Sequence, residues 1–100
     1  MTELPPFTDF ARQVNTLFTA ETAHGPITLQ LTEAKELLDT HHPGQLRTPM
    51  SLIFINDQQP NMVLSQGIYQ LNHPVLGSLS LYVEPILSGS PAPDYQVLIN

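Results

Sequence analysis

The sequence QGIYQLNHPVLGSLSLYV, residues 66–83, contains two extended segments separated by a turn. Leucine and valine alternate with serine and tyrosine through residues 78–83, which is the period of a half-buried strand. Between the two segments, Pro74 pre-sets a type I turn, and Gly77 closes it in the left-handed conformation. We therefore predict a β-hairpin that pairs residues 64–73 with residues 78–87.

Individual residues of this hairpin carry further expectations. Ile68, Tyr69 and Leu71 are its packing candidates. Gly67 predicts a bulge or a bend in the first strand, and Pro85 predicts that the second strand ends there or lies at an edge of the sheet.

Residues 18–23 and 27–31 predict a second hairpin nearer the start of the chain. Its turn contains Gly25 and Pro26, and apolar and polar residues alternate after that turn. Residues 32–38 fit either a continued strand or one helical turn, and we interpret them as strand.

Two more strands follow from the apolar pattern. Residues 50–55 include the longest strongly apolar run, which predicts a central strand whose later part is buried on both faces. Alternation over residues 94–100 predicts a final strand. Turn residues without any period indicate an exposed loop at residues 39–48. We also predict a polar loop at residues 56–61 and a flexible-to-extended loop at residues 88–93.

One helical stripe precedes these strands, formed by Phe10, Val14, Leu17 and Phe18. It predicts a helix from Thr8, as the N-cap, to Asn15 or Leu17. We therefore expect a single domain over residues 1–100, mostly β (α+β), with one short N-terminal helix. About six antiparallel strands would close as a small barrel or roll, because closure hides strand edges.

The composition excludes several classes of function. The net charge is −6, and only Arg12, Lys35 and Arg47 are basic, so we expect neither nucleic-acid binding nor docking on an anionic membrane. The absence of cysteine excludes disulfides, zinc–thiolate sites and cysteine nucleophiles. No secretory signal and no apolar segment of ~20 residues is visible, so we expect a cytoplasmic protein.

Candidate chemistry is sparse. The sequence has no G-x-S-x-G elbow, dinucleotide-binding fingerprint or phosphate loop, so we predict no catalytic residue and no cofactor. His41 and His42 are adjacent in a loop, a spacing that rarely chelates one ion, and we predict no metal site while leaving metal binding by this pair open. For His73 we favour a hydrogen bond that fixes the hairpin turn over a functional role. The sequence leaves open whether the chain is an enzyme, and the missing motifs favour a non-enzymatic protein.

The chain's three tyrosines, Tyr69, Tyr82 and Tyr95, all lie on predicted strands. Core packing with the hydroxyl at the rim explains them simply, because tyrosine is amphipathic. Tyr82, however, is opposite in phase to Leu81 and Val83, which predicts an exposed aromatic that could anchor a protein partner. We therefore treat Tyr82, Tyr69 and Tyr95 as candidate partner-binding residues.

The segment from Thr48 to Asn100 resembles a family of small bacterial proteins with a domain of unknown function. Its pattern is P-F-S-L-x-F, then Q-G-x-Y-x-L-x-H-P-x-L-G, L-F-x-x-P and a terminal Y-x-x-x-F-N, matched here by residues 49–54, 66–77, 81–85 and 95–100. Met50, Tyr82 and Ile99 replace phenylalanine, which keeps the packing. The resemblance implies no particular activity. It implies that relatives are encoded beside phage-tail-type genes, which suggests a role in assembly. The residues of its central motif to which we assign structural roles are Gln66, Gly67, His73, Pro74 and Gly77.

Two hypotheses for function remain. The first is a non-enzymatic protein-interaction or assembly module that binds a protein, itself or another, through strand edges, including the edge of residues 94–100. The alternative is a small-ligand-binding barrel, or a minor enzyme, with a pocket in its interior.

Overall fold

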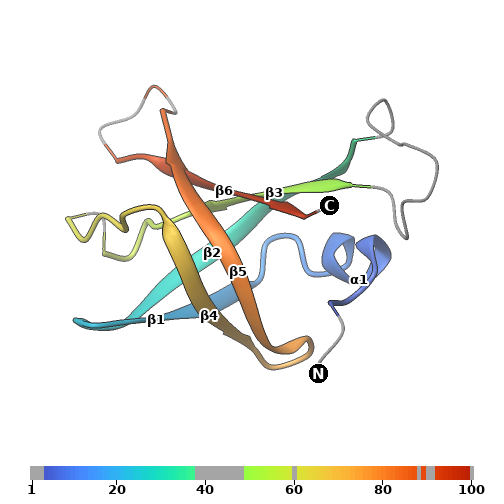
Figure 1. The fold of residues 1–100 in the computed structure, drawn as a ribbon, viewed down its shortest axis with the longest axis horizontal. Helices are drawn as coiled ribbons and strands as arrows, with labels where there is room; N and C mark the ends of the chain where they lie inside the picture. Colours follow the sequence, from blue (N-terminus) through green and yellow to red (C-terminus); the bar gives the residue numbers. More distant parts are fainter. Residues whose placement is uncertain (1–3, 38–48, 60, 88, 90–91, 100) are drawn as a thin grey trace.

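The computed structural model describes residues 4–37, 49–59, 61–87, 89 and 92–99. Within these residues, six strands form a closed barrel and a short helix lies at one end of it (Figure 1). The elements in chain order are α1 (Phe7–Ala11), β1 (Leu17–Thr22), β2 (Gly25–Glu36), β3 (Met50–Ile55), β4 (Gly67–His73), β5 (Gly77–Ile86) and β6 (Asp94–Ile99). The predicted fold class, an antiparallel barrel with one short N-terminal helix, is confirmed.

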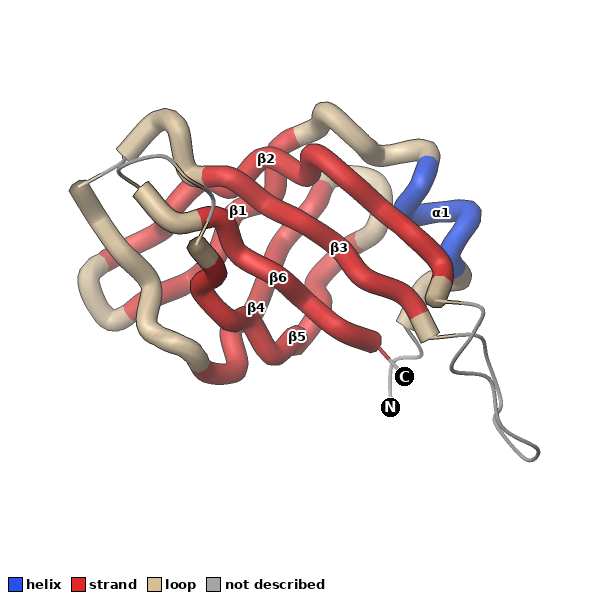
Figure 2. Tube along the Cα trace, turned by 90° about the horizontal axis from the view of Figure 1, so that it is seen from above, coloured by secondary structure: helices blue, strands red, loops and turns tan. Residues whose placement is uncertain are grey.

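The strands follow one another around the barrel in the order β1-β2-β3-β6-β5-β4, and every neighbouring pair is antiparallel (Figures 1 and 2). The last strand, β6, pairs with β3 on one side and with β5 on the other. Our expectation of an unpaired edge at residues 94–100 is therefore wrong where these ladders run, which is at residues 95–99 on the β3 side and at residues 94–96 on the β5 side. Barrel closure uses the backbone groups that an open sheet would leave free.

Pro85 does not end β5 and does not lie on an edge strand. It lies opposite Tyr95, and β5 continues to Ile86. Because Pro85 is one residue from the end of its strand, where the ladder itself ends, the missing N–H interrupts little pairing.

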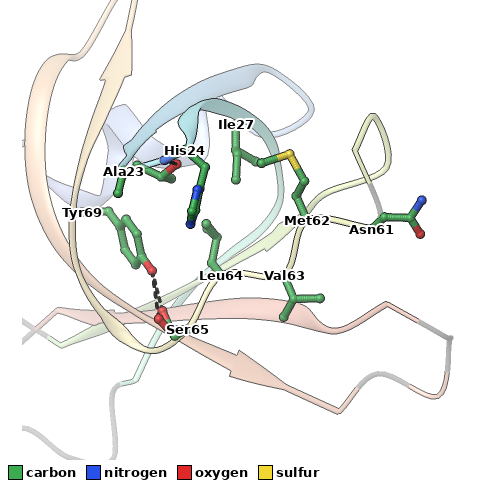
Figure 3. A pocket seen from close by; sticks show the side chains of 10 residues that line it. Ala23, His24, Ile27, Asn61, Met62, Val63, Leu64, Ser65 and Tyr69 are labelled. Carbon is green, nitrogen blue, oxygen red and sulfur yellow. Dashed lines mark hydrogen bonds between the residues drawn. The ribbon is translucent and has the colours of Figure 1, made fainter.

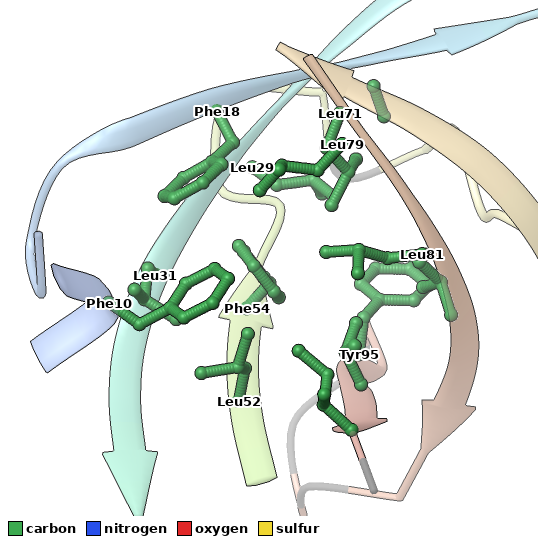
Figure 4. Packing of buried hydrophobic residues seen from close by; sticks show 14 of the residues in the cluster. Phe10, Phe18, Leu29, Leu31, Leu52, Phe54, Leu71, Leu79, Leu81 and Tyr95 are labelled. Atoms are coloured by element: carbon green, nitrogen blue, oxygen red, sulfur yellow. The ribbon is translucent and has the colours of Figure 1, made fainter. Parts of the chain in front are cut away.

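The interior of the barrel is filled by alternating side chains from all six strands (Figure 4). Phe18 of β1 and Phe54 of β3 meet there edge to face, with ring centroids 5.2 Å apart and an interplanar angle of 85°. Such pairs add about 0.5–1.5 kcal/mol to the effect of area burial. The buried apolar residues are Phe10, Phe18, Ala20, Ile27, Leu29, Leu31, Met50, Leu52, Phe54, Leu64, Leu71, Leu79, Leu81, Val83, Tyr95, Val97 and Ile99.

Helix α1 is shorter than predicted, because the chain leaves the helical conformation before Asn15. Asn15 has a φ of +75°, a left-handed conformation that asparagine tolerates. Its N–H donates to the carbonyl of Leu31 at 2.6 Å, so the chain joins β2 instead of completing another helical turn. The predicted cap is also wrong, since Pro6 occupies the N-cap position. Phe10 still points into the core, as the stripe predicted.

Strand β2 extends to Glu36, which confirms that residues 32–36 continue the strand. Its register with β3 shifts between Leu31 and Glu33. Strand β4 begins at Gly67, three residues later than predicted, and its register with β5 is regular from Gly67 onward. In β3 the first half, and not the later part, is buried on both faces. The predicted loop at residues 39–48 lies outside the described residues.

Candidate functional site

Two exposed apolar side chains lie opposite each other on the outer face of the barrel. Ile68 of β4 pairs with Tyr82 of β5, and their side chains are 75% and 45% exposed. Leu98 of β6, 49% exposed, also faces outward. The β5–β6 ladder ends at the Glu84–Gln96 pair, and Tyr82 and Leu98 each lie two residues beyond that pair on the outward face of their strands. We call Ile68, Tyr82 and Leu98 the outer row.

The outer row corrects one expectation and agrees with another. Ile68 is not a packing residue, because Tyr69 and Leu71 occupy the alternate positions that face inward. The sequence carried this signal, since Ile68 has the same phase as Gln70 and Asn72. Tyr82 is exposed, as its phase against Leu81 and Val83 predicted.

Carboxylates and neutral amides border the outer row. Glu84 lies two residues from Tyr82 on the same face of β5. On the other side, Glu21 of β1 pairs with Gln70, which makes it a diagonal neighbour of Ile68. Asn72 Nδ2 donates to Glu21 Oε1 at 3.1 Å, and Gln70 Nε2 donates to Asn72 Oδ1 at 3.1 Å. The surroundings of the outer row are therefore polar, negatively charged and held by side-chain hydrogen bonds.

Tyr69 lies on the opposite face of β4 from Ile68, at one mouth of the barrel. Its hydroxyl donates to the backbone carbonyl of Ser65 at 2.7 Å (Figure 3). The half-buried ring lines a pocket of about 540 Å³ between the β1–β2 turn and residues 61–65. Tyr69 and Tyr82 therefore belong to different surfaces.

Tyr95 is not a surface residue, so it cannot anchor a partner. Only 1% of it is exposed, and its hydroxyl accepts a hydrogen bond from the Leu64 N–H at 3.0 Å. The sequence carried a signal for this burial, because Tyr95 occupies the same face of its strand as Val97 and Ile99, which both face inward.

His73 uses both ring nitrogens inside the protein. Nδ1 accepts hydrogen bonds from the N–H groups of Val75 and Leu76 at 3.0 and 3.2 Å. The proton is therefore on Nε2, which donates to Thr16 Oγ1 at 2.9 Å, and Thr16 Oγ1 donates to the Gln13 carbonyl. Burial lowers the pKa of His73 below its usual value of 6.5, which favours this neutral ring.

The other central motif residues lie in or near the same hairpin. Gly77 has a φ of +81°, the left-handed conformation that the turn required of it. Pro74 lies in the exposed turn and Gln66 is exposed just before β4. A Cβ atom on Gly67 would meet only the ring of Tyr69, at 4.0 Å. These positions describe a turn and a strand start and do not gather around a cavity.

Among the described residues, no group of three or more histidines and carboxylates is placed to hold a metal ion. His41 and His42 lie outside those residues. No helix of the described ranges has the length and apolar character needed to cross a membrane.

Comparison with known proteins gives one match. Residues 5–99 match the profile of a family described as Domain of unknown function (DUF6916). No curated protein and no solved structure matches the chain significantly.

Proposed function

We propose that this chain, which belongs to the DUF6916 family of domains of unknown function, is a non-enzymatic module that binds a partner protein through the outer row. One observation carries the proposal. An isoleucine of β4 and a tyrosine of β5 lie opposite each other, and a leucine faces outward on the neighbouring strand β6, each about half exposed or more.

The energetics of such a surface favour protein binding. Aromatic anchors surrounded by apolar contacts supply most of the binding energy in protein interfaces, and tyrosine is among the most enriched. The row lies on the rigid wall of a barrel, so little conformational entropy is lost when a partner covers it. Each apolar Å² removed from water contributes roughly 25 cal/mol.

The charge around the row favours a different protein over a second copy of this chain. Glu84 and Glu21 border the row, and the net charge of the chain is −6. Two copies meeting at this face would bring like charges together, which costs affinity. A partner with an apolar face bordered by lysine or arginine is complementary.

This proposal replaces strand addition as the mode of binding. Strand β6 pairs with β3 at residues 95–99 and with β5 at residues 94–96, so we assign the contacts to the outward side chains. An assembly role in a bacterial, phage-tail-type setting, which the family resemblance suggested, would use the same surface. A ligand in the barrel interior has no comparable support, since the buried side chains fill that space.

Site-specific crosslinking tests the proposal. Benzoylphenylalanine is placed at position 68, 82 or 98 in cells that produce the protein naturally, and the crosslinked species is identified. We expect one and the same partner at all three positions. Position 75 is the matched control, because Val75 is 69% exposed but lies in the β4–β5 turn.

The purified pair is then titrated by calorimetry. We expect Ile68→Ser and Tyr82→Ser each to raise the Kd at least about fivefold, the effect of losing about 1 kcal/mol at a contact residue. Val75→Ser should leave the Kd unchanged. Equal Kd values for Tyr82→Ser and the wild type contradict the proposal, and a crosslink between two copies of this chain contradicts a different protein as partner.

A further inference from the structure

The pocket at the mouth of the barrel is separate from the outer row. It lies at the end away from α1, between the β1–β2 turn and residues 61–65 (Figures 1 and 3). Its volume of about 540 Å³ falls within the range of small-molecule sites, roughly 300–1,000 Å³. His24, Tyr69 and Leu64 point toward a common space, whereas Asn61 and Val63 point away from it (Figure 3).

Hydrogen bonds within the chain hold the walls of this pocket. Asn56 Nδ2 donates to the carbonyls of Gln59 and Met62 at 2.9 and 3.0 Å, which shapes the segment before Leu64. The Leu64 N–H donates to the Tyr95 hydroxyl inside the barrel. A ligand would therefore enter a preformed site and would not have to order this loop.

The chemistry of the lining selects against charge. Its ten residues include no aspartate, glutamate, lysine or arginine: Thr22, Ala23, His24, Ile27, Asn61, Met62, Val63, Leu64, Ser65 and Tyr69. A charged ligand would lose hydration there without gaining a counter-charge, which is costly. The net charge of −6 adds repulsion against anions.

The polar groups also indicate what the ligand would present. Tyr69 donates its proton to the Ser65 carbonyl, and its oxygen, which also lies 3.5 Å from Ser65 Oγ, keeps capacity to accept a further hydrogen bond. Ile27, Met62 and Leu64 supply apolar surface beside it. We infer that this pocket binds an uncharged, mostly apolar small molecule that donates a hydrogen bond to Tyr69.

Two fluorescent probes that differ in charge test this inference. N-phenyl-1-naphthylamine is neutral, apolar and has one N–H donor, and 8-anilinonaphthalene-1-sulfonate has the same ring system with an added sulfonate. We expect the neutral probe to bind one per chain, with a Kd at least tenfold lower than that of the sulfonate. Equal or tighter binding of the sulfonate, or no binding of the neutral probe, overturns the inference.

Amide chemical shifts locate the neutral probe independently of any variant. We expect its largest shifts at Ala23, His24 and residues 62–65. The largest shifts at residues 68, 82 and 98 would overturn the inference, because the probe would then occupy the outer row.

Three variants complete the test. Ala23 is exposed on the rim, so Ala23→Trp should fill the pocket and raise the Kd of the neutral probe at least tenfold, whereas Val75→Trp should not change it. Tyr69→Phe should raise the Kd about fivefold, the effect of one hydrogen bond of about 1 kcal/mol. Unchanged binding by Ala23→Trp overturns the inference. Ile68→Ser should retain binding, so failure of the proposed protein interface would not affect this result.

Discussion

At the scale of single residues, His73 links the β4–β5 turn to residues 16–18, which are distant in sequence. Its ring binds the backbone of the β4–β5 turn through Nδ1 and Thr16 through Nε2. The same ring packs on Phe18, with centroids 4.4 Å apart. Protonation of Nδ1 would replace an acceptor by a donor facing two N–H groups. The contacts of His73 in the folded state therefore favour the neutral imidazole.

The stability of the protein should depend on the protonation of His73. Because burial lowers the pKa of His73 in the folded state, the unfolded chain binds more protons between that pKa and 6.5. The contribution of His73 is present above pH 6.5, decreases as the pH falls through the folded pKa, and is constant below it. We expect the free energy of unfolding to fall by up to about 1.4 kcal/mol per pH unit within this window.

Urea unfolding measured from pH 7.5 to pH 4.5 checks this dependence. His73→Asn keeps an acceptor near the turn but does not titrate, so its stability should fall less over the same interval. Identical slopes for His73→Asn and the wild type would contradict the assignment of the pH dependence to His73.

Tyr95 provides a second residue-scale prediction. Tyr95→Phe removes the acceptor of the buried Leu64 N–H, which should reduce the free energy of unfolding by about 1–3 kcal/mol. Tyr82→Phe is the matched control, because Tyr82 is exposed, and its effect should stay within about 0.5 kcal/mol. Chemical denaturation measures both. An equal effect of the two substitutions would show that the Leu64 contact contributes nothing measurable.

At the scale of elements, the β4–β5 hairpin is held by its turn as well as by its strands. Seven residue pairs connect β4 and β5, from Gly67–Val83 to His73–Gly77. His73 binds the turn backbone from one end, and Gly77 supplies the left-handed residue at the other. Strand register is fixed where the turn geometry is fixed.

Substitution of the two hairpin glycines should isolate the effect of backbone strain, because a Cβ atom is not crowded at either position. A Cβ atom on Gly77 would meet nothing within 4 Å, so Gly77→Ala tests only its φ of +81°. We expect a loss of about 1–2 kcal/mol in the free energy of unfolding. Gly67→Ala, without a positive φ, should be neutral or stabilising by up to about 1 kcal/mol. Thermal unfolding distinguishes the two, and equal effects would contradict a conformational role for Gly77.

At the scale of the whole molecule, closure of the barrel depends on pairs that are far apart in sequence. Thr19 pairs with Asn72, and Met50 pairs with Ile99. The two proposed binding surfaces, the outer row and the mouth pocket, are both presented by this one closed wall. Among the described residues, every buried side-chain nitrogen or oxygen has a hydrogen-bond partner.

Folding of this chain should accordingly be slow for its size. Long-range strand pairs must form before much apolar surface is buried, so we expect refolding on the millisecond-to-second scale typical of all-β domains. Stopped-flow dilution from urea, followed by tyrosine fluorescence, measures the rate. Refolding within microseconds would indicate that local contacts, and not barrel closure, limit the process.

Much of the candidate site could be predicted from the sequence, because apolar–polar alternation shows which face of a strand each residue occupies. Alternation around residues 78–83 placed Tyr82 outward, and the same rule applied to Ile68 would have placed it beside Tyr82. The pocket was not visible, because its walls come from the β1–β2 turn and residues 61–65, which meet only after the barrel closes.

The sequence by itself determined the six strands, the turn at residues 73–77 and the class of fold, because side-chain alternation and turn chemistry are local properties of the chain. Only the tertiary structure decided that β6 lies between β3 and β5 in a closed barrel, and that α1 ends at Ala11. Those outcomes depend on which distant strands pair and where the chain must turn to join them, and no local pattern encodes that choice.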